Sequence, residues 1–320
     1  MAAIAYRTLY SELLDCLHHQ LVGFSNPSPG RHVAGEPNGP RSGHGEGQVV
    51  PATELDARRK LVSRLVEEAG LARPPEAAGQ LLKAIADEGF FESGGVLAGP
   101  MAFYAYPAIL GVPAPAAVSR KLEEDYAANQ KLLLIAAESV PSLRRALKKV
   151  DASFLPVPPL VEQAPMTRYL AQSGQLVEVL PPDKPLGRAI LELPGGLSFL
   201  IEAPVPAVLL HDAGVPLLVP APARYAVHKL IASSLSLSKG LVARNGSDDI
   251  AQAEFLLGTL LEVGEGASLA RAFKDAWNRG DAWQDALSKG LAKLPADYFA
   301  PLRAALGADG VMLEQGYALA

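Results

Sequence analysis

The run "GGVLAGPMAFYAYPAIL", from Gly94 to Leu110, sets a short apolar segment between glycines and follows it with a proline and a helix-forming segment. A short apolar run bounded by glycine is typical of a buried strand, and proline is favoured in the first turn of a helix. We therefore expect a strand, a glycine turn and a helix in this order. Around this turn, at Gly95 and Gly99, backbone N–H groups could approach a phosphate, although tight packing would require glycine equally well.

The rest of the chain divides by pattern into helical and mixed regions, which together predict an α+β fold. Between the helical regions, short apolar runs predict strands at "KLLLIAA", "QLVEVL", "RAILEL", "LSFLIE" and "AVLLHDAGVPLLV". We expect an N-terminal helix at 1–24, a flexible linker at 25–53, a helical pair at 54–92, an α/β core at 93–221 and a C-terminal helical domain at 222–320.

Composition excludes several classes of protein. The 29 basic and 34 acidic side chains give a net charge of -5, so we expect no extended surface for nucleic acid. No apolar run approaches the roughly 20 residues that span a bilayer, so we expect no membrane segment. The single cysteine, Cys16, and the absence of a signal-peptide pattern at the start predict a cytoplasmic protein.

Three carboxylates are candidates for holding a metal ion. Glu123 and Asp125 would project from one face if their segment were a strand, and two carboxylates on one face suit a hard cation such as Mg²⁺. Glu178 interrupts the apolar run "LVEVL" and could face the same ion or solvent. The alternative is a helix, because Val118, Leu122 and Tyr126 recur at a helical spacing. Local sequence favours the helix, and position in the chain favours the metal site.

The segment "ARYAVHKLIASSL" predicts a helix with a basic face. Arg224 and His228 are one turn apart, and Lys229 follows directly. Such a face could contact a triphosphate or a nucleic-acid end, or it could simply be exposed to solvent.

Taken together, the ordered segments "FFESGGVLAGPMAFYAYPAILGV", "VDASFLPVPPL", "LVEVLPP", "APVPAVLLHDAGVPLLVPAPARYAVHKLIAS" and "DDIAQAEFLL" resemble bacterial nucleotidyltransferase-like proteins of the DNA polymerase β superfamily. The resemblance covers roughly Tyr6 to Leu294. It implies a polymerase-β-like core, a small mixed sheet with flanking helices, between an N-terminal helical arm and a C-terminal helical domain. It also implies transfer of a nucleotidyl group from a nucleoside triphosphate to an acceptor, which could be a protein, a tRNA end or a small molecule.

The resemblance also implies a role for each candidate residue. Glu123 and Asp125 match the carboxylate pair, and Glu178 matches a third carboxylate on a neighbouring strand, so these three would be the catalytic ligands of up to two Mg²⁺ ions. Gly99 matches the glycine of the phosphate-binding turn. From charge and placement we add further candidates for nucleotide binding, namely Gly95, Arg224 and Lys229.

The chain departs from the superfamily pattern at four positions, one of which is the third carboxylate, where Glu178 replaces the usual Asp. Pro100 replaces the small residue after the turn glycine and has no N–H to offer a phosphate. Glu123 replaces the usual first Asp, and Asp248 stands where a basic residue is expected. These departures support a second hypothesis, a catalytically weakened member of the fold that acts as a nucleotide- or partner-binding module.

Overall fold

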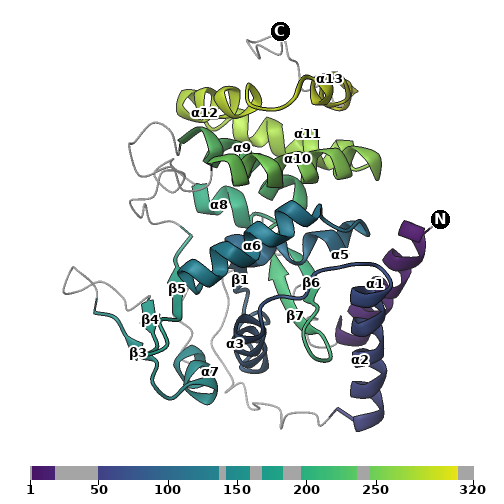
Figure 1. Ribbon diagram of the computed structural model, residues 1–320. Helices are drawn as coiled ribbons and strands as arrows, with labels where there is room; N and C mark the ends of the chain where they lie inside the picture. The colour runs from purple at the N-terminus through teal and green to yellow at the C-terminus, as the bar shows by residue number, and fades with distance from the viewer. Residues whose placement is uncertain are drawn as a thin grey trace, which may run out of the picture.

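The computed structural model describes residues 2–18, 50–136, 142–158, 168–182, 196–235 and 246–308. It is an α+β structure with two small sheets and many helices (Figure 1), as the sequence predicts. The elements are, in chain order, α1 (Ala2–His18), α2 (Ala52–Glu67), α3 (Glu76–Asp87), β1 (Val96–Ala98), α4 (Pro100–Phe103), α5 (Tyr106–Leu110), α6 (Ala116–Asn129), β2 (Lys131–Ile135), α7 (Ser142–Val150), β3 (Leu155–Pro156), β4 (Arg168–Leu170), β5 (Leu176–Leu180), α8 (Gly196–Ile201), β6 (Val205–Leu209), β7 (Val215–Val219), α9 (Pro222–Leu235), α10 (Gly246–Glu262), α11 (Gly266–Trp277), α12 (Asp281–Leu291), a 3-10 turn η2 (Ala296–Tyr298) and α13 (Phe299–Ala308).

The larger sheet is mixed, with the strand order β1-β2-β5-β4-β3. β2 runs parallel to β5, and the other neighbouring pairs are antiparallel. In this register Leu133 of β2 is opposite Glu178 of β5, which is opposite Arg168 of β4. Residues opposite each other on neighbouring strands project from the same face, so this row and Lys131, two residues before Leu133, share one face of the sheet.

The first strand and its turn confirm the prediction from the glycine-rich run. β1 is buried along its whole length, and Gly99 follows it with φ 68° and ψ −162°, a conformation that only glycine adopts readily. Pro100 then occupies the first turn of α4. The short helix and α5 pack their aromatic side chains inward, and Phe103 and Tyr106 meet edge to face at 6.0 Å.

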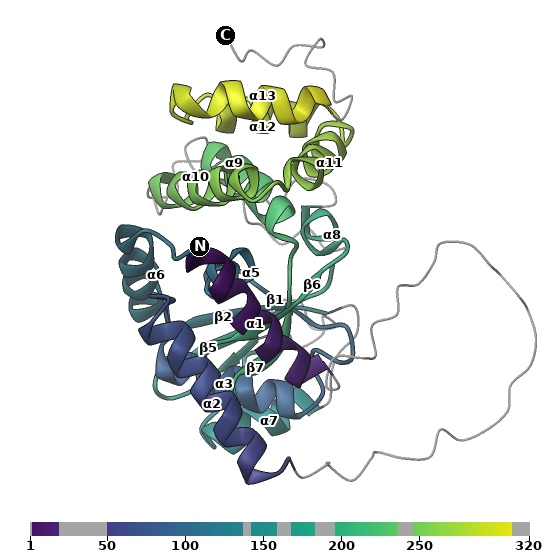
Figure 2. The same ribbon diagram turned by 90° about the vertical axis from the view of Figure 1, so that its right-hand side faces the viewer.

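The two N-terminal helices pack against the β6–β7 hairpin and run side by side (Figure 2). The Tyr10 hydroxyl accepts a hydrogen bond from the Val208 N–H at 2.8 Å, and the buried Arg58 donates to the Ala213 carbonyl at 2.9 Å. A separate apolar cluster joins the two helices to the hairpin. It includes Leu13 and Leu17 of α1, further residues of α2, and Val208 of β6. The predicted N-terminal helix is therefore docked on the core.

The C-terminal helices α9 to α13 form a layer above the strands in Figure 1. α9 packs against α10, α11 and α12. The contact with α12 is close, because a Cβ added at Gly290 would lie 2.3 Å from the Leu230 carbonyl oxygen. Among the described residues, no helix is both long and apolar enough to cross a membrane.

Some sequence predictions differ from the structure or fall outside it. "LSFLIE" was expected to be a strand but forms the helix α8, since Leu197, Phe199 and Leu200 all bury their side chains and a one-sided strand would expose one of them. The predicted strand "RAILEL" and most of the predicted linker at 25–53 lie outside the described residues.

Candidate functional site

Glu123 and Asp125 lie on the helix α6, so the expectation of a strand at this position is wrong. The helix follows Pro115 and buries Val118, Leu122 and Tyr126, which are spaced four residues apart. This apolar stripe decides the local structure, because a strand would place the charged Arg120 and Glu124 on the same face as these buried side chains. Residues two apart on a helix point about 200° away from each other, so Glu123 and Asp125 do not present their carboxylates together.

The three predicted ligands have different surroundings. Glu123 is exposed, whereas the Asp125 carboxylate lies 3.5 Å from the Lys121 ammonium, which is also 3.9 Å from Asp248 of α10. Glu178 lies on the sheet instead. Within the described part of the chain, no group of three or more His, Cys, Asp or Glu side chains could hold a metal ion. The structure therefore does not bring Glu123, Asp125 and Glu178 together into one site.

Glu178 is paired with a cation from its own sheet. Its carboxylate accepts a hydrogen bond from the Lys131 ammonium, and the Arg168 guanidinium lies 3.9 Å away on its other side. The side chains of Lys131 and Glu178 are only 19% and 12% exposed, so water screens the pair weakly. On this face of β2, Leu133 lies opposite Glu178, and Lys131 comes two residues before Leu133.

These residues do not suit a magnesium site. Mg²⁺ requires oxygen ligands in near-octahedral geometry, and the strand β2, "KLLLI", offers no side-chain oxygen. Glu178 supplies one carboxylate, but its partners Lys131 and Arg168 are cations that would repel the ion. The donor set beside Glu178 therefore does not fit the metal that the superfamily resemblance implies.

The glycine turn approaches the same strand. A Cβ added at Gly99 would lie 3.4 Å from the Leu133 Cβ, so the turn after β1 is adjacent to the position opposite Glu178. The Gly99 carbonyl accepts a hydrogen bond from the Tyr225 hydroxyl at 3.1 Å, which ties the turn to α9. The following helix, α4, has only four residues and starts with Pro100, so it offers few N–H groups to a phosphate.

Gly95 has a packing role in the structure. A Cβ added there would lie 2.1 Å from a carbon of the Phe90 ring, which is itself buried. Because any side chain at this position would overlap the ring, the need for glycine is explained without a phosphate.

The two basic candidates on α9 are held by carboxylates. Arg224 donates to Asp275 at 2.7 Å, reaches Glu202 at 3.0 Å and lies over the Phe199 ring. Lys229 is buried and binds Asp249 of α10 at 2.6 Å.

Burial alone would lower the pKa of Lys229, but the Asp249 carboxylate and the Tyr225 hydroxyl outweigh it and hold the pKa above its ordinary value. Lys229 is thus a permanently charged member of an ion pair between α9 and α10. Asp248 and Asp249 have separate partners, Lys121 and Lys229. Asp248, which replaces the basic residue of the superfamily pattern, therefore links α10 to α6.

The comparison with known families gives one match. A family model described as nucleotidyltransferase matches residues 76–278, from the start of α3 to the end of α11 and more than half of the chain. The chain belongs to this nucleotidyltransferase family. No curated protein and no solved structure matches it. The match covers both sheets and leaves α1, α2, α12 and α13 outside it.

Sequence reasoning missed Lys131 and Tyr225. Lys131 is the first residue of the predicted strand "KLLLIAA". A charged residue in an otherwise apolar strand needs a counter-ion, and this need was the signal that a neighbouring strand could carry a carboxylate. Tyr225 lies in the predicted helix "ARYAVHKLIASSL", but the partner of its hydroxyl is the Gly99 carbonyl, 126 residues away, and this contact follows from tertiary structure.

Proposed function

We propose that this member of the nucleotidyltransferase family has lost metal-dependent transfer and acts as a binding module. The observation that supports the proposal is the pairing of Lys131 with Glu178. In the superfamily pattern, the strand beside the third carboxylate carries two further acidic ligands. Here β5, which carries Glu178, lies between β2 and β4. The positions of β2 nearest Glu178 on its face are Lys131 and Leu133, and the β4 residue opposite Glu178 is Arg168, so none of them is acidic.

The charge balance explains why this arrangement opposes a metal. The Lys131 ammonium already neutralises Glu178 at contact distance, so a divalent ion would have to displace it and then bind with Lys131 and Arg168 nearby. If a divalent ion displaced Lys131 from Glu178, one carboxylate would face two cationic side chains and the metal ion in a site with little exposure to water. This arrangement is electrostatically unfavourable. The gain from one carboxylate ligand does not offset this cost.

The second candidate function is Mg²⁺-dependent transfer of a nucleotidyl group to a protein, a tRNA end or a small molecule. Two observations favour it, the family match and the position of Glu178 on a strand that runs parallel to β2. In that case Glu178 would be essential and Lys131 would have to release it when a nucleoside triphosphate and metal bind.

The test separates binding from transfer. The full chain is incubated with each labelled nucleoside triphosphate and Mg²⁺ or Mn²⁺, alone and with a cell extract as the source of acceptors. We expect no label on any acceptor, and we expect nucleotide affinity, measured by equilibrium dialysis, to be the same with metal and with a chelator. Incorporation by the wild type that Glu178→Gln abolishes would overturn the proposal and support the second candidate.

A gain-of-function variant provides the matched control. Lys131→Asp combined with Leu133→Asp places two carboxylates on the Glu178 face of β2 and removes the internal cation. We expect this variant to bind Mn²⁺ in a calorimetric titration, and the wild type not to bind it. Equal Mn²⁺ affinity in the two proteins, lost in Glu178→Gln, would show that the native site accepts metal.

A further inference from the structure

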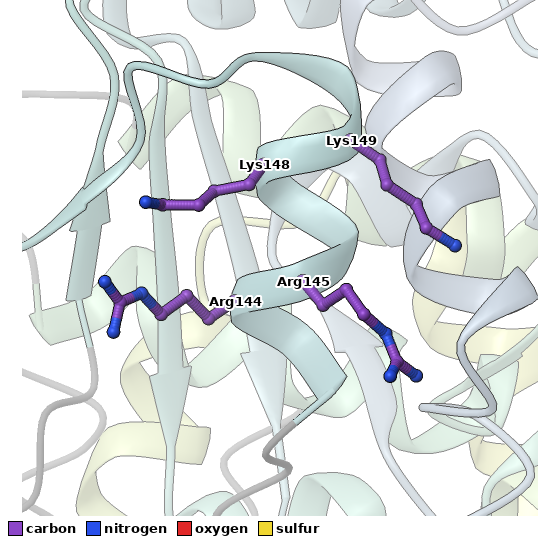
Figure 3. A pocket seen from close by; sticks show the side chains of 4 residues that line it. All are labelled: Arg144, Arg145, Lys148 and Lys149. Atoms are coloured by element: carbon purple, nitrogen blue, oxygen red, sulfur yellow. The ribbon is translucent and has the colours of Figure 1, made fainter.

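α7 concentrates positive charge on a helix of nine residues. Arg144, Arg145, Lys148 and Lys149 are all exposed, whereas Leu143, Ala146 and Leu147 on its other side are buried in the core. We call these four side chains the α7 cationic face. In a chain with a net charge of -5, four cations on one helix are a marked local excess of positive charge. The four residues line a shallow hollow on the surface (Figure 3).

Two of the four cations share a single carboxylate as their partner. Glu88, which follows α3, accepts a hydrogen bond from Arg145 Nε at 2.8 Å and from Lys149 Nζ at 2.5 Å. The Arg145 guanidinium and the Lys149 ammonium lower the pKa of Glu88, so this carboxylate is charged at neutral pH. The Glu88 side chain is only 5% exposed, and it anchors one edge of α7 to α3.

The other two cations point away from this anchor. Figure 3 shows Arg144 and Lys148, one turn apart, extending together to the side of the helix opposite Arg145 and Lys149. Among the residues that the structure describes, neither forms an ion pair. The helix dipole accounts for cations in the last turn, where Lys148 and Lys149 lie, but it does not account for Arg144 in the first turn.

The surface chemistry favours one class of partner. Protein interfaces place aromatic or apolar anchors at their centre, whereas the four side chains of the α7 cationic face are all charged and the exposed Val150 lies at the end of the helix. Helices that lie on membranes insert an apolar face, whereas the apolar face of α7 is already buried in the protein. A nucleic-acid backbone requires only cations spaced along a surface, since its phosphates supply a repeated charge.

We propose that the α7 cationic face binds the phosphate backbone of a nucleic acid, with Arg144 and Lys148 as its main contacts. This site is local, so it is compatible with the expectation from net charge that the chain has no extended surface for nucleic acid. It does not depend on the proposed loss of metal-dependent transfer, because none of its residues belongs to the Lys131–Glu178 pair. Glu88 restrains the site, since it holds Arg145 and Lys149 away from a ligand.

The first experiment measures the fluorescence anisotropy of short labelled single-stranded RNA and duplex DNA with the full chain at low salt. We expect Arg144→Ala combined with Lys148→Ala to weaken binding by at least about 10-fold. The control, Lys60→Ala combined with Lys289→Ala, removes the same charge at exposed positions of α2 and α12 and should change affinity less than about 2-fold. Equal weakening by both variants, or no binding by the wild type, would overturn the proposal.

A second variant moves the result in the opposite direction. Glu88→Gln frees Arg145 and Lys149, so we expect tighter binding and a steeper dependence of affinity on salt. For the wild type, two to three phosphate contacts predict roughly a 10- to 40-fold loss of affinity for duplex DNA between about 50 and 200 mM salt, and roughly a 7- to 20-fold loss for single-stranded RNA. Vesicles of anionic lipid serve as the competing partner, and binding to them without binding to either nucleic acid would refute the proposal. Unchanged affinity in Glu88→Gln would also contradict it.

Discussion

Leu133 on β2 and Glu178 on β5 are directly opposite each other in a parallel register, and Lys131, on the same face, donates to the Glu178 carboxylate. β5, the strand beside β2, thus carries a carboxylate at Glu178, and the cation bound to it is the side chain of Lys131 rather than a metal ion. A metal can dissociate, but a lysine side chain cannot. The Lys131–Glu178 pair therefore links β2 to β5 without a bound ion.

Lys131→Met should destabilise the protein by about 2 kcal/mol, because it leaves the Glu178 carboxylate poorly hydrated and without its main partner. Methionine keeps most of the apolar stem of lysine, so the lost charge dominates the result. The free energy of unfolding is measured with urea. A double-mutant cycle with Glu178→Gln supplies the control, since the double variant should lose less stability than the sum of the two single variants. Additive losses would show that the two side chains are not coupled.

Lys229→Met should cost more, about 3 kcal/mol, because it leaves the Asp249 carboxylate uncompensated between α9 and α10. The matched control is Lys289→Met, which removes the same group from an exposed pair with Asp285 and should cost less than about 0.5 kcal/mol. If Lys229 instead contacts a nucleotide, its replacement would lower nucleotide affinity and leave the unfolding free energy unchanged. Chemical unfolding and equilibrium dialysis distinguish the two outcomes.

Gly95→Ala should destabilise the protein by about 1–3 kcal/mol, since the new methyl group would overlap the buried Phe90 ring. Gly307→Ala is the control, because nothing lies within 4 Å of a Cβ at this helical position and alanine favours helix. That substitution should stabilise the protein by about 0.5–1 kcal/mol. Thermal unfolding of the two variants measures both effects. A stable Gly95→Ala protein with weakened nucleotide binding would restore the phosphate role for this residue.

Much of the fold follows from local pattern. The strand, turn and helix after Gly94, the helices of the C-terminal region and the strand structure within "AVLLHDAGVPLLV" are confirmed, because their apolar spacing and their turn residues agree. For α8 the sequence predicts a strand, because a short and mostly apolar run such as "LSFLIE" fits either structure and length alone does not separate them.

The site was less predictable because its residues meet through sheet register. The predicted ligands Glu123 and Asp125 were assigned by their position between the glycine turn and Glu178, against a local helical pattern that proved correct. Which strand lies beside β5 depends on topology, and the pairing of Lys131 with Glu178 spans 47 residues of sequence. No local pattern specifies that neighbour.

The imidazole of His228 predicts a loss of stability in acid. Burial, with a smaller effect of the neighbouring Lys229 ammonium, lowers the pKa of His228 from 6.5 to about 3. Its Nδ1 is buried and has no hydrogen-bond partner among the described residues, so protonation gains nothing in the folded state. Between pH 6.5 and 3 the unfolded chain binds a proton at this position and the folded chain does not. Stability should therefore fall as the pH falls, by at most about 1.4 kcal/mol for each pH unit from this residue.

The variant His228→Leu isolates this contribution, because leucine fills a similar volume and does not titrate. Urea unfolding of the two proteins at several pH values from 7 to about 4 should give curves that diverge below pH 6.5, with the variant losing less stability. The other described histidine with a charged neighbour is His211, whose Nδ1 lies 3.7 Å from Glu76, and it is unchanged in both proteins, so its contribution cancels in the comparison. Parallel curves across this range would mean that His228 is protonated in the folded protein as readily as in the unfolded chain.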